Sequence, residues 1–284
     1  MILVNVLERF QAIPRIFKHL NTELCLADPV APLFIFIVGM GFQLAYTRML
    51  KERGALTASL ASLKRYCILF VVAVFVYHFS MRRIFWDALT EISVAGILAL
   101  PFIGRPQTIR IGAMIFYPTL LAIFPNFQLA GKVFEPFLWV VPLLLGTFVA
   151  DAINTNDSKK IVSTCAWWGA GLFAIGLTFT QFFHLGNGAT EWGYKVLYLG
   201  LGFWIYLCLH YLADVRRTPL PHMTVLGRNA LVIYALHYYI DSDMRKLIER
   251  DAPLTTAVFS FLVVYFACLT IATYLNHKKY YVTI

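Results

Sequence analysis

A histidine and a carboxylate that could work together in acid–base chemistry lie in one N-terminal loop. His19 is followed in this loop by Asp28, and both precede an apolar segment at 30–50. An imidazole whose ring is oriented by a nearby carboxylate can act as a general base near neutral pH. The same two residues also fit an ordinary polar pair at a membrane interface, with no chemical role. Their spacing alone leaves both interpretations open.

A pair of acidic residues lies where another apolar segment begins. Asp87 and Glu91 are four positions apart, so on a helix they share one face. They could bind the hydroxyl groups of a substrate, or pair with Arg82 and Arg83 as an interfacial charge cluster. Glu91 lies deeper in the apolar segment, where an ionisable side chain is costly, and it is therefore the better candidate for a functional residue.

A third polar group lies in or next to the apolar segment 224–241. Asn229 could bind a substrate or form a hydrogen bond to a neighbouring helix. His237 and Asp241 are four positions apart, at the end of the segment where we expect His19 to lie. We therefore predict His237 and Asn229 as substrate-binding residues.

The elements that must position these residues are membrane-spanning helices. The chain is 60% hydrophobic, 16% aromatic and only 14% charged, which excludes a water-soluble globular protein. A spanning helix needs about 20 apolar residues. The predicted fold class is all-α, a polytopic transmembrane bundle that forms a single domain over 1–284. We expect about nine spans, near 30–50, 63–81, 88–103, 109–125, 136–152, 161–183, 194–213, 224–241 and 254–276.

The N-terminal segment and the loops complete this prediction. Residues 1–10 are interpreted as the remnant of a first transmembrane helix, because Met1–Leu7 is apolar but too short to span a bilayer. We expect a short helical stub there. Loops on one side of the membrane are predicted near 51–65, 104–110, 153–160 and 214–223.

The charge and cysteine content narrow the possible partners. The net charge is +9, and more than half of the basic residues fall on the side of these four loops. That bias favours this side as cytoplasmic, facing anionic lipid or an anionic cofactor, and no nucleic acid is expected. The five cysteines are scattered without a CxxC pair, which indicates packing residues, with neither disulfides nor a metal site.

A resemblance to a known family begins in the stretch 17–45, which reads FKHLNTELCLADPVAPLFIFIVGMGFQLA. This stretch resembles heparan-α-glucosaminide N-acetyltransferase and its bacterial relatives. In that family a loop His is followed by an Asp and then by a helix with the pattern V-x-P-x-F-x-F-x-x-G. The matching residues are His19, Asp28, Val30, Pro32, Phe34, Phe36 and Gly39.

Further segments resemble the same family. Met1–Asn5 is similar to the end of its first helix, which an Asn closes, and Trp86–Ile92 occupies the place of a helix start. Pro136–Gly146 and Leu226–His237 are similar to its P-W-x-x-x-x-L-L-G and L-G-x-N-A-L-x-x-Y-x-L-H helices. The chain departs from the family at two places. Leu20–Leu24 stands where the family has a Trp and a Gly, and a segment with Glu8, Arg9 and Pro14 stands where the family often has a glycine-rich turn.

The resemblance implies acyl transfer across a membrane, from acetyl-coenzyme A to an amine or hydroxyl of a sugar or glycan. It implies His19 as the general base or acyl carrier and Asp28 as the residue that orients the imidazole ring. Asn5 would donate to the thioester oxygen. Cationic partners for the coenzyme A phosphates are expected on the basic face, although each also fits a charge that anchors a helix end. They are Lys64, Arg65, Arg216 and Arg228.

Three other interpretations remain open at this point. A membrane O-acyltransferase of the acyltransferase-three kind has a similar topology, but its early Arg-x-x-x-His pairing is not visible. A small transporter could use intramembrane His, Asp and Glu as proton relays, but no internal repeat is visible. An inactive homologue is the third. In each case we expect an integral multi-pass protein of a bacterial inner (plasma) membrane that contacts lipid, and a homo-oligomer is possible.

Overall fold

The computed structural model describes residues 1–18, 25–76, 88–124, 128–129, 132–133, 135–182 and 186–281. The chain divides into two compact units. The terminal unit comprises Met1–Val30, Leu177–Lys195 and Cys208–Thr283. The central unit comprises Ala31–Gly176 and Val196–Leu207.

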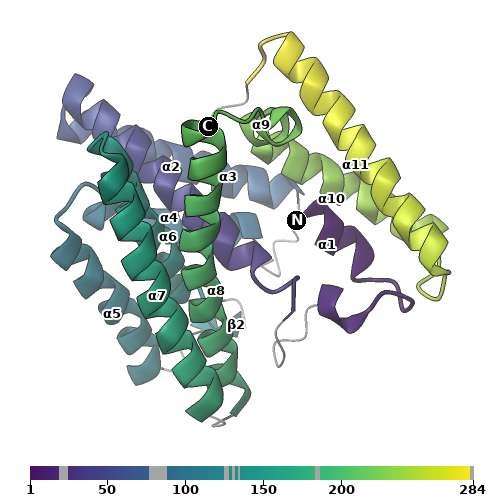
Figure 1. The fold of residues 1–284 in the computed structure, drawn as a ribbon, viewed down its shortest axis with the longest axis horizontal. Coiled ribbons are helices and arrows are strands. Elements are labelled where there is room, and N and C mark those ends of the chain that lie inside the picture. The colour runs from purple at the N-terminus through teal and green to yellow at the C-terminus, as the bar shows by residue number, and fades with distance from the viewer. Residues whose placement is uncertain are drawn as a thin grey trace. The chain divides into compact units, whose positions relative to one another are not determined.

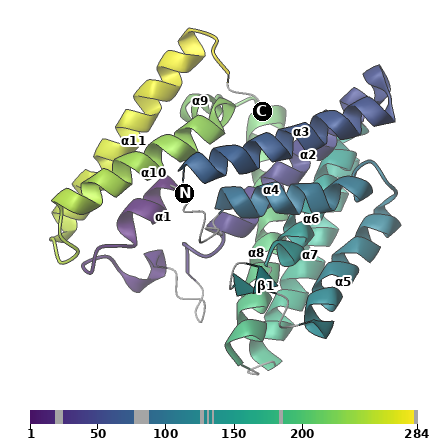
Figure 2. The same cartoon turned by 180° about the vertical axis from the view of Figure 1, so that it is seen from behind.

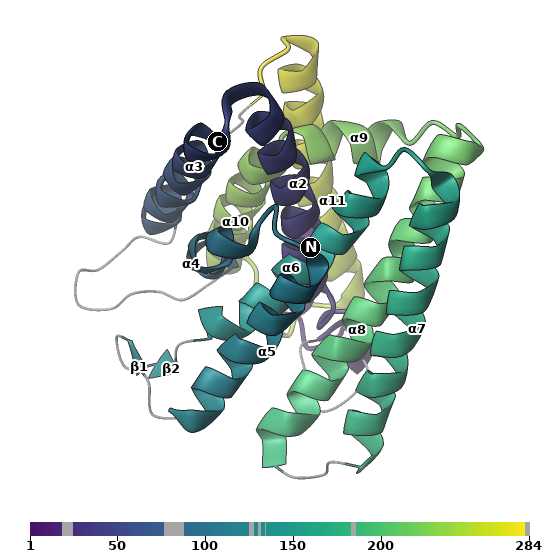
Figure 3. The same ribbon diagram turned by 90° about the vertical axis from the view of Figure 1, so that its left-hand side faces the viewer.

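The central unit is a bundle of apolar helices. In chain order these are α2 (Val30–Arg53), α3 (Ala55–Val76), α4 (Ala88–Ala99), the short 3-10 turn η2 (Leu100–Phe102), α5 (Gln107–Ile123), α6 (Pro136–Asn154), most of α7 (Ser158–Phe182) and the middle of α8 (Gly186–His210). Helix α4 packs between α3 and α6, and α5 also packs on α6 (Figure 2). Helices α7 and α8 run side by side in opposite directions (Figure 3).

Two short strands lie between α5 and α6 in the sequence. They are β1 (Gln128–Leu129) and β2 (Lys132–Val133), which pair antiparallel. Gln128 lies opposite Val133. These two-residue strands leave the all-α fold class unchanged.

The terminal unit brings the two ends of the chain together. Its elements are α1 (Ile2–Leu7), the 3-10 turn η1 (Arg15–Phe17), the π-helical turn η3 (Tyr211–Val215), α9 (Pro221–Arg228), α10 (Ala230–Leu247) and α11 (Leu254–His277). Helix α1 packs against both α10 and α11 (Figure 1). Val6 of α1, Ile233 of α10 and Val264 of α11 share one buried apolar cluster. This contact fixes the polar residues of α1 relative to those of α10.

The all-α fold class is confirmed, and the count of nine spans is not confirmed. Among the described residues, six helices are long and apolar enough to cross a membrane: α2, α3, α6, α7, α11 and the segment Gly193–Val215 of α8 and η3. The apolar segments Ala88–Phe102 and Gln107–Ile123 also form helices, but shorter ones. A helical stub is present at Ile2–Leu7, as predicted.

The predicted loop at 51–65 is helical instead. Helix α2 continues to Arg53 and α3 begins at Ala55, so the connection between them is Gly54. Gly54 has φ +82°, a left-handed conformation that only glycine adopts without strain. The segment after it is rich in Ala and Leu, which favour helix even where polar residues interrupt them. Lys64 and Arg65 therefore lie on α3.

The predicted span at 224–241 is interrupted. Helix α9 ends at Arg228 and α10 begins at Ala230, with the backbone of Asn229 outside the helical region at φ −123° and ψ 39°. The Asn229 amide donates to the carbonyl oxygen of Tyr280 at 3.2 Å, which stabilises this break. The connections predicted near 104–110, 153–160 and 214–223 are confirmed, although helices begin or end within each range.

Two glycines allow α2 and α6 to touch through their backbones. A Cβ atom at Gly39 would overlap the carbonyl oxygen of Leu143, and one at Gly146 would overlap that of Phe36. Small residues commonly allow such close packing between membrane helices. Phe36 and Gly39 belong to one motif of the family resemblance and Gly146 ends another, so these motifs describe a helix contact.

We expect Gly39→Ala and Gly146→Ala to lower stability by about 1–3 kcal/mol each, because an added methyl group must push two backbones apart. Thermal unfolding of the detergent-solubilised protein measures the effect. Gly41→Ala is the matched control on α2, since nothing lies within 4 Å of a Cβ there. A melting temperature for Gly39→Ala equal to that of Gly41→Ala would contradict the proposed backbone contact.

Candidate functional site

The terminal unit contains a hydrogen bond between residues from opposite ends of the chain. The Asn5 amide nitrogen on α1 lies 3.0 Å from Nε2 of His237 on α10. His237 is only 1% exposed, so this bond is sheltered from water. Because the amide nitrogen can only donate, the imidazole Nε2 accepts. Asn5 and His237 belong to separate sequence motifs, and the structure joins them.

The other ring nitrogen of His237 is also engaged. Nδ1 lies 3.1 Å from the backbone carbonyl oxygen of Ile233, one turn earlier on the same helix. A carbonyl oxygen accepts, so Nδ1 carries the proton and the ring is the neutral Nδ1–H tautomer. The Tyr234 ring packs edge-on against the imidazole, with ring centroids 5.2 Å apart. Three contacts therefore fix the plane and the tautomer of His237.

A charged pair lies one turn beyond His237. The Asp241 carboxylate, 4% exposed, accepts a hydrogen bond from Nε of Arg245 at 2.7 Å. Arg245 also donates from Nη2 to the backbone carbonyl oxygen of Asn5 at 3.3 Å. Arg245 therefore connects α10 to α1 next to the Asn5–His237 bond.

Arg9, which follows α1, faces this charged pair. The pKa of the Arg9 guanidinium is lowered, mainly because the group is removed from water. The nearby Asp241 carboxylate raises this pKa, and the positive charge of Arg245 lowers it. The Arg9 Cζ lies 4.4 Å from the centre of the Phe10 ring. Within the described chain, the buried atoms Nε and Nη2 of Arg9 and Oδ1 of Asp241 have no hydrogen-bond partner.

The other residues predicted to be catalytic or to bind the acceptor through a carboxylate are His19, Asp28, Asp87 and Glu91. His19 and Asp87 lie outside the described residues. Asp28 is half-buried in the turn that precedes α2 and belongs to the terminal unit. Glu91 is half-buried in the first turn of α4, in the central unit.

The residues predicted to bind coenzyme A phosphates do not form one cluster within either unit. Lys64 is exposed and Arg65 half-buried on α3 in the central unit. In the terminal unit, Nε of Arg216 donates to the Tyr211 hydroxyl at 2.9 Å. Arg228 donates from Nη1 to Oδ1 of Asn276 at 2.8 Å and so connects α9 to α11. Asn229, 1% exposed, is held by the Tyr280 carbonyl described above.

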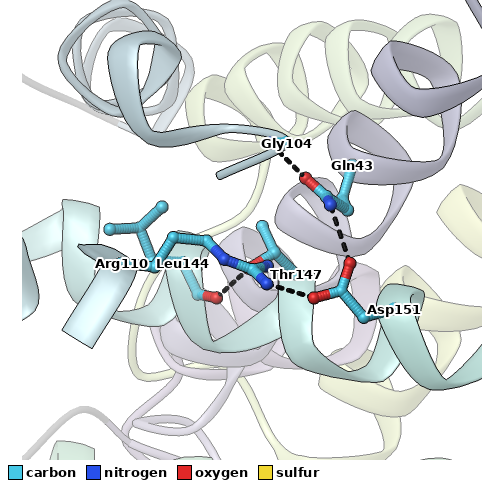
Figure 4. Close-up of polar contacts among 6 residues, drawn as sticks. All are labelled: Gln43, Gly104, Arg110, Leu144, Thr147 and Asp151. Atoms are coloured by element: carbon cyan, nitrogen blue, oxygen red, sulfur yellow. Dashed lines mark hydrogen bonds and ion pairs between the residues drawn. The ribbon is translucent and has the colours of Figure 1, made fainter. Parts of the chain in front are cut away.

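The central unit contains its own buried polar network (Figure 4). Arg110 of α5, 2% exposed, pairs with the Asp151 carboxylate of α6 and donates from Nη1 to the Thr147 hydroxyl at 2.5 Å. The Gln43 amide of α2 donates to Asp151 at 2.7 Å, and its oxygen accepts from the Gly104 backbone N–H at 3.0 Å. The network therefore joins three helices and a turn, with its charges compensated, and this arrangement is typical of a structural role.

Sequence reasoning had assigned no functional role to several of these residues. Asp241 was noted only as the neighbour of His237, and Arg9 only as a departure from the family pattern. Arg110 and Asp151 were assigned no role. The available signal was their position inside or beside apolar helices, where an ionisable residue requires a partner. Among the described residues, no group of three or more His, Cys, Asp or Glu side chains could hold a metal ion.

We expect Asp151→Leu to reduce stability by about 3–5 kcal/mol, because it leaves the buried Arg110 guanidinium without its counter-charge. The double change Arg110→Met with Asp151→Leu should recover most of this loss, since no unpaired charge remains. Unfolding of the detergent-solubilised protein measures both. Glu52→Ala is the control, because it removes the exposed Arg48–Glu52 pair on α2, which contributes little. Equal stability of Asp151→Leu and Glu52→Ala would contradict a buried network.

Comparison with known protein families completes the description of the site. The family model for heparan-alpha-glucosaminide N-acetyltransferase, catalytic, matches residues 2–185, well over half of the chain. No curated protein matches. The matched residues include Asn5, Arg9 and Asp28, and they end before α10, which carries His237 and Asp241. The expectation drawn from the sequence motifs is thus confirmed: the chain belongs to the heparan-alpha-glucosaminide N-acetyltransferase catalytic family.

Proposed function

We propose that this multi-pass membrane protein transfers an acetyl group from acetyl-coenzyme A to an amine or hydroxyl of a sugar or glycan. The observation that carries the proposal is the partly buried hydrogen bond between Asn5 and His237. It holds together a residue inside the family match and one from the C-terminal part of the chain. The six apolar helices agree with such a reaction at a membrane.

Asn5 is the residue whose orientation this contact fixes. One N–H of its amide is used by His237, so the second N–H and the amide oxygen have defined directions. A fixed amide N–H can stabilise the negative charge that develops on a thioester oxygen when a nucleophile attacks. Because both nitrogens of His237 are already engaged, His237 acts by positioning Asn5.

The general base is then His19, with Asp28 orienting its ring. In the proposed reaction the acceptor nitrogen or oxygen attacks the thioester carbon and the carbon–sulfur bond breaks. His19 takes the acceptor's proton and returns it to the departing coenzyme A thiolate, so protons balance. An acetyl group carried briefly on His19 is the other form of this mechanism. Glu91, Asp87 and Asn229 remain proposed contacts to the acceptor.

The donor is proposed to bind from the basic face of the protein. The coenzyme A phosphates need cationic partners, and Arg provides bidentate contacts to them. Arg216 already has its Nε bonded to Tyr211, which restricts the guanidinium and reduces the entropy lost on binding. Lys64, Arg65 and Arg228 are the other proposed partners. We expect the protein in a bacterial inner membrane, with lipid and a glycan or amino sugar as partners.

We expect membranes that contain this protein to transfer radiolabelled acetyl from acetyl-coenzyme A to glucosamine or a glycan. His19→Ala should reduce the transfer rate by at least ~10²-fold, because it removes the base or acyl carrier. The matched control is His222→Ala, since His222 is exposed on α9. Undiminished transfer by His19→Ala would eliminate this mechanism. Solute uptake by proteoliposomes, with no binding of coenzyme A, would instead support the transporter interpretation.

The donor site gives a separate expectation. Arg216→Ala should raise the KM for acetyl-coenzyme A with little change in kcat, because phosphate contacts far from the thioester contribute uniform binding. Lys246→Ala is the control, since it removes an exposed cation whose partner is Asp243. Initial rates at varied acetyl-coenzyme A concentration separate the two parameters. An unchanged KM in Arg216→Ala would remove Arg216 from the donor site.

A further inference from the structure

Beside the Asn5–His237 bond, three buried polar atoms of Asp241 and Arg9 have no hydrogen-bond partner among the described residues. Asp241 has one carboxylate oxygen bonded to Arg245, and its other oxygen, Oδ1, is buried. Arg9 has Nε and Nη2 buried. Within the described residues none of these three atoms has a hydrogen-bond partner. Buried polar groups are nearly always satisfied in native structures, so these three atoms are available to a polar partner.

The geometry of the donors limits the ligand. Nε and Nη2 lie on one edge of the guanidinium, and together they form a fork that binds two oxygens or one doubly accepting group. Asp241 Oδ1 is an acceptor and requires a donor from the ligand. The ligand must therefore accept from Arg9 and donate to Asp241 at the same place.

Charge narrows the choice further. Arg9, Arg245 and Asp241 together carry one excess positive charge. A phosphate or carboxylate would bind Arg9 but would offer no donor to Asp241 and would be repelled by it. A plain cation would bind Asp241 but would be repelled by the two guanidinium groups. A hydroxyl group meets both needs, because it accepts through its oxygen and donates through its proton.

We propose that Arg9 and Asp241 bind neighbouring hydroxyl groups of the acceptor sugar and thereby position its amine beside Asn5. This inference rests on the proposed function, since it names the acceptor's binding residues. Asp241 lies four residues after His237 on α10, ~6 Å along the helix axis. That distance corresponds to about one sugar ring. Arg245 is a positioning residue, since it holds the Asp241 carboxylate by its other oxygen.

The proposal also explains a departure from the family. Arg9 stands where the family often has a glycine-rich turn, and glycine has no side chain to bind a ligand. Asp241 lies outside the residues that the family model matches. These two side chains therefore determine the acceptor specificity of this chain, beside a reaction common to the family.

Binding of glucosamine to the purified protein, titrated by saturation-transfer NMR, tests the site independently of catalysis. Asp241→Asn keeps the shape of the side chain and should weaken binding about 10-fold to 100-fold, the range expected for a charged hydrogen bond. Arg9→Lys keeps the charge but loses the fork, and it should also weaken binding. Asp243→Asn is the matched control, because Asp243 is exposed and pairs with Lys246.

Deoxy analogues of glucosamine distinguish binding from a structural effect. One of these analogues lacks the ring hydroxyl that Asp241 contacts in our proposal. The wild-type protein should bind that analogue at least about 10-fold more weakly than glucosamine. Asp241→Asn should bind these two sugars nearly equally, since the partner of that hydroxyl is already lost. A purely structural role for Asp241 would leave the discrimination intact and would overturn the proposal.

The outcomes separate this inference from the proposed function. If glucosamine binds with the expected variant pattern but no acetyl transfer occurs, the sugar site stands and the acetyltransferase proposal fails. If transfer occurs but Asp241→Asn and Arg9→Lys bind glucosamine like the wild type, the sugar site is wrong and the acetyltransferase proposal stands. No binding of glucosamine by the wild type also overturns the sugar site.

Discussion

The structure depends on the cost of burying a polar group without a partner among apolar helices. In such surroundings each unpaired donor or acceptor loses its interactions with water and gains nothing in return. Arg110 meets this constraint with two of its nitrogens, through Thr147 and Asp151, while its Nε has no hydrogen-bond partner among the described residues. His237 meets it through Asn5 and Ile233. In both units, hydrogen bonds between residues far apart in sequence therefore determine which helices pack together and which face each helix presents to its neighbour.

The close approach of α2 and α6 makes the central network possible. Gly39 and Gly146 lie where these helices touch through their backbones. Gln43 is one turn beyond Gly39, and Thr147 follows Gly146 directly. A small separation of the two helices would therefore lengthen the 2.7 Å bond between Gln43 and Asp151. The geometry of the polar network therefore depends on the close apolar contact between α2 and α6.

Much of the helical architecture could be predicted from the sequence, because long apolar segments have few alternatives in a membrane. The boundaries were less predictable. Hydropathy favoured a loop at 51–65, whereas helix propensity and a left-handed Gly54 produce two nearly continuous helices. The break at Asn229 was missed, since its stabilising contact with Tyr280 comes from a distant part of the chain.

The candidate site was predictable in part. Asn5 and His237 were identified as separate motifs, but only the fold shows that they bond to each other. Arg9 and Asp241 carry no sequence pattern that would pair them, since a three-dimensional contact between α10 and the segment after α1 creates their proximity. His19 and Asp87 lie outside the described residues, so their roles stay predictions.

The terminal unit therefore contains two kinds of polar group, and an enzyme that binds and acylates a sugar needs both. The first kind, Asn5 and His237, is oriented by internal hydrogen bonds. Such groups suit the reacting centre, where reorganisation during the reaction would cost rate. The second kind, Arg9 and Asp241, has donors and an acceptor without partners in the part of the chain that the structure describes. These groups suit recognition. A ligand with matching hydroxyls forms hydrogen bonds to these buried donors and this acceptor, whereas a ligand that lacks those hydroxyls leaves them unpaired.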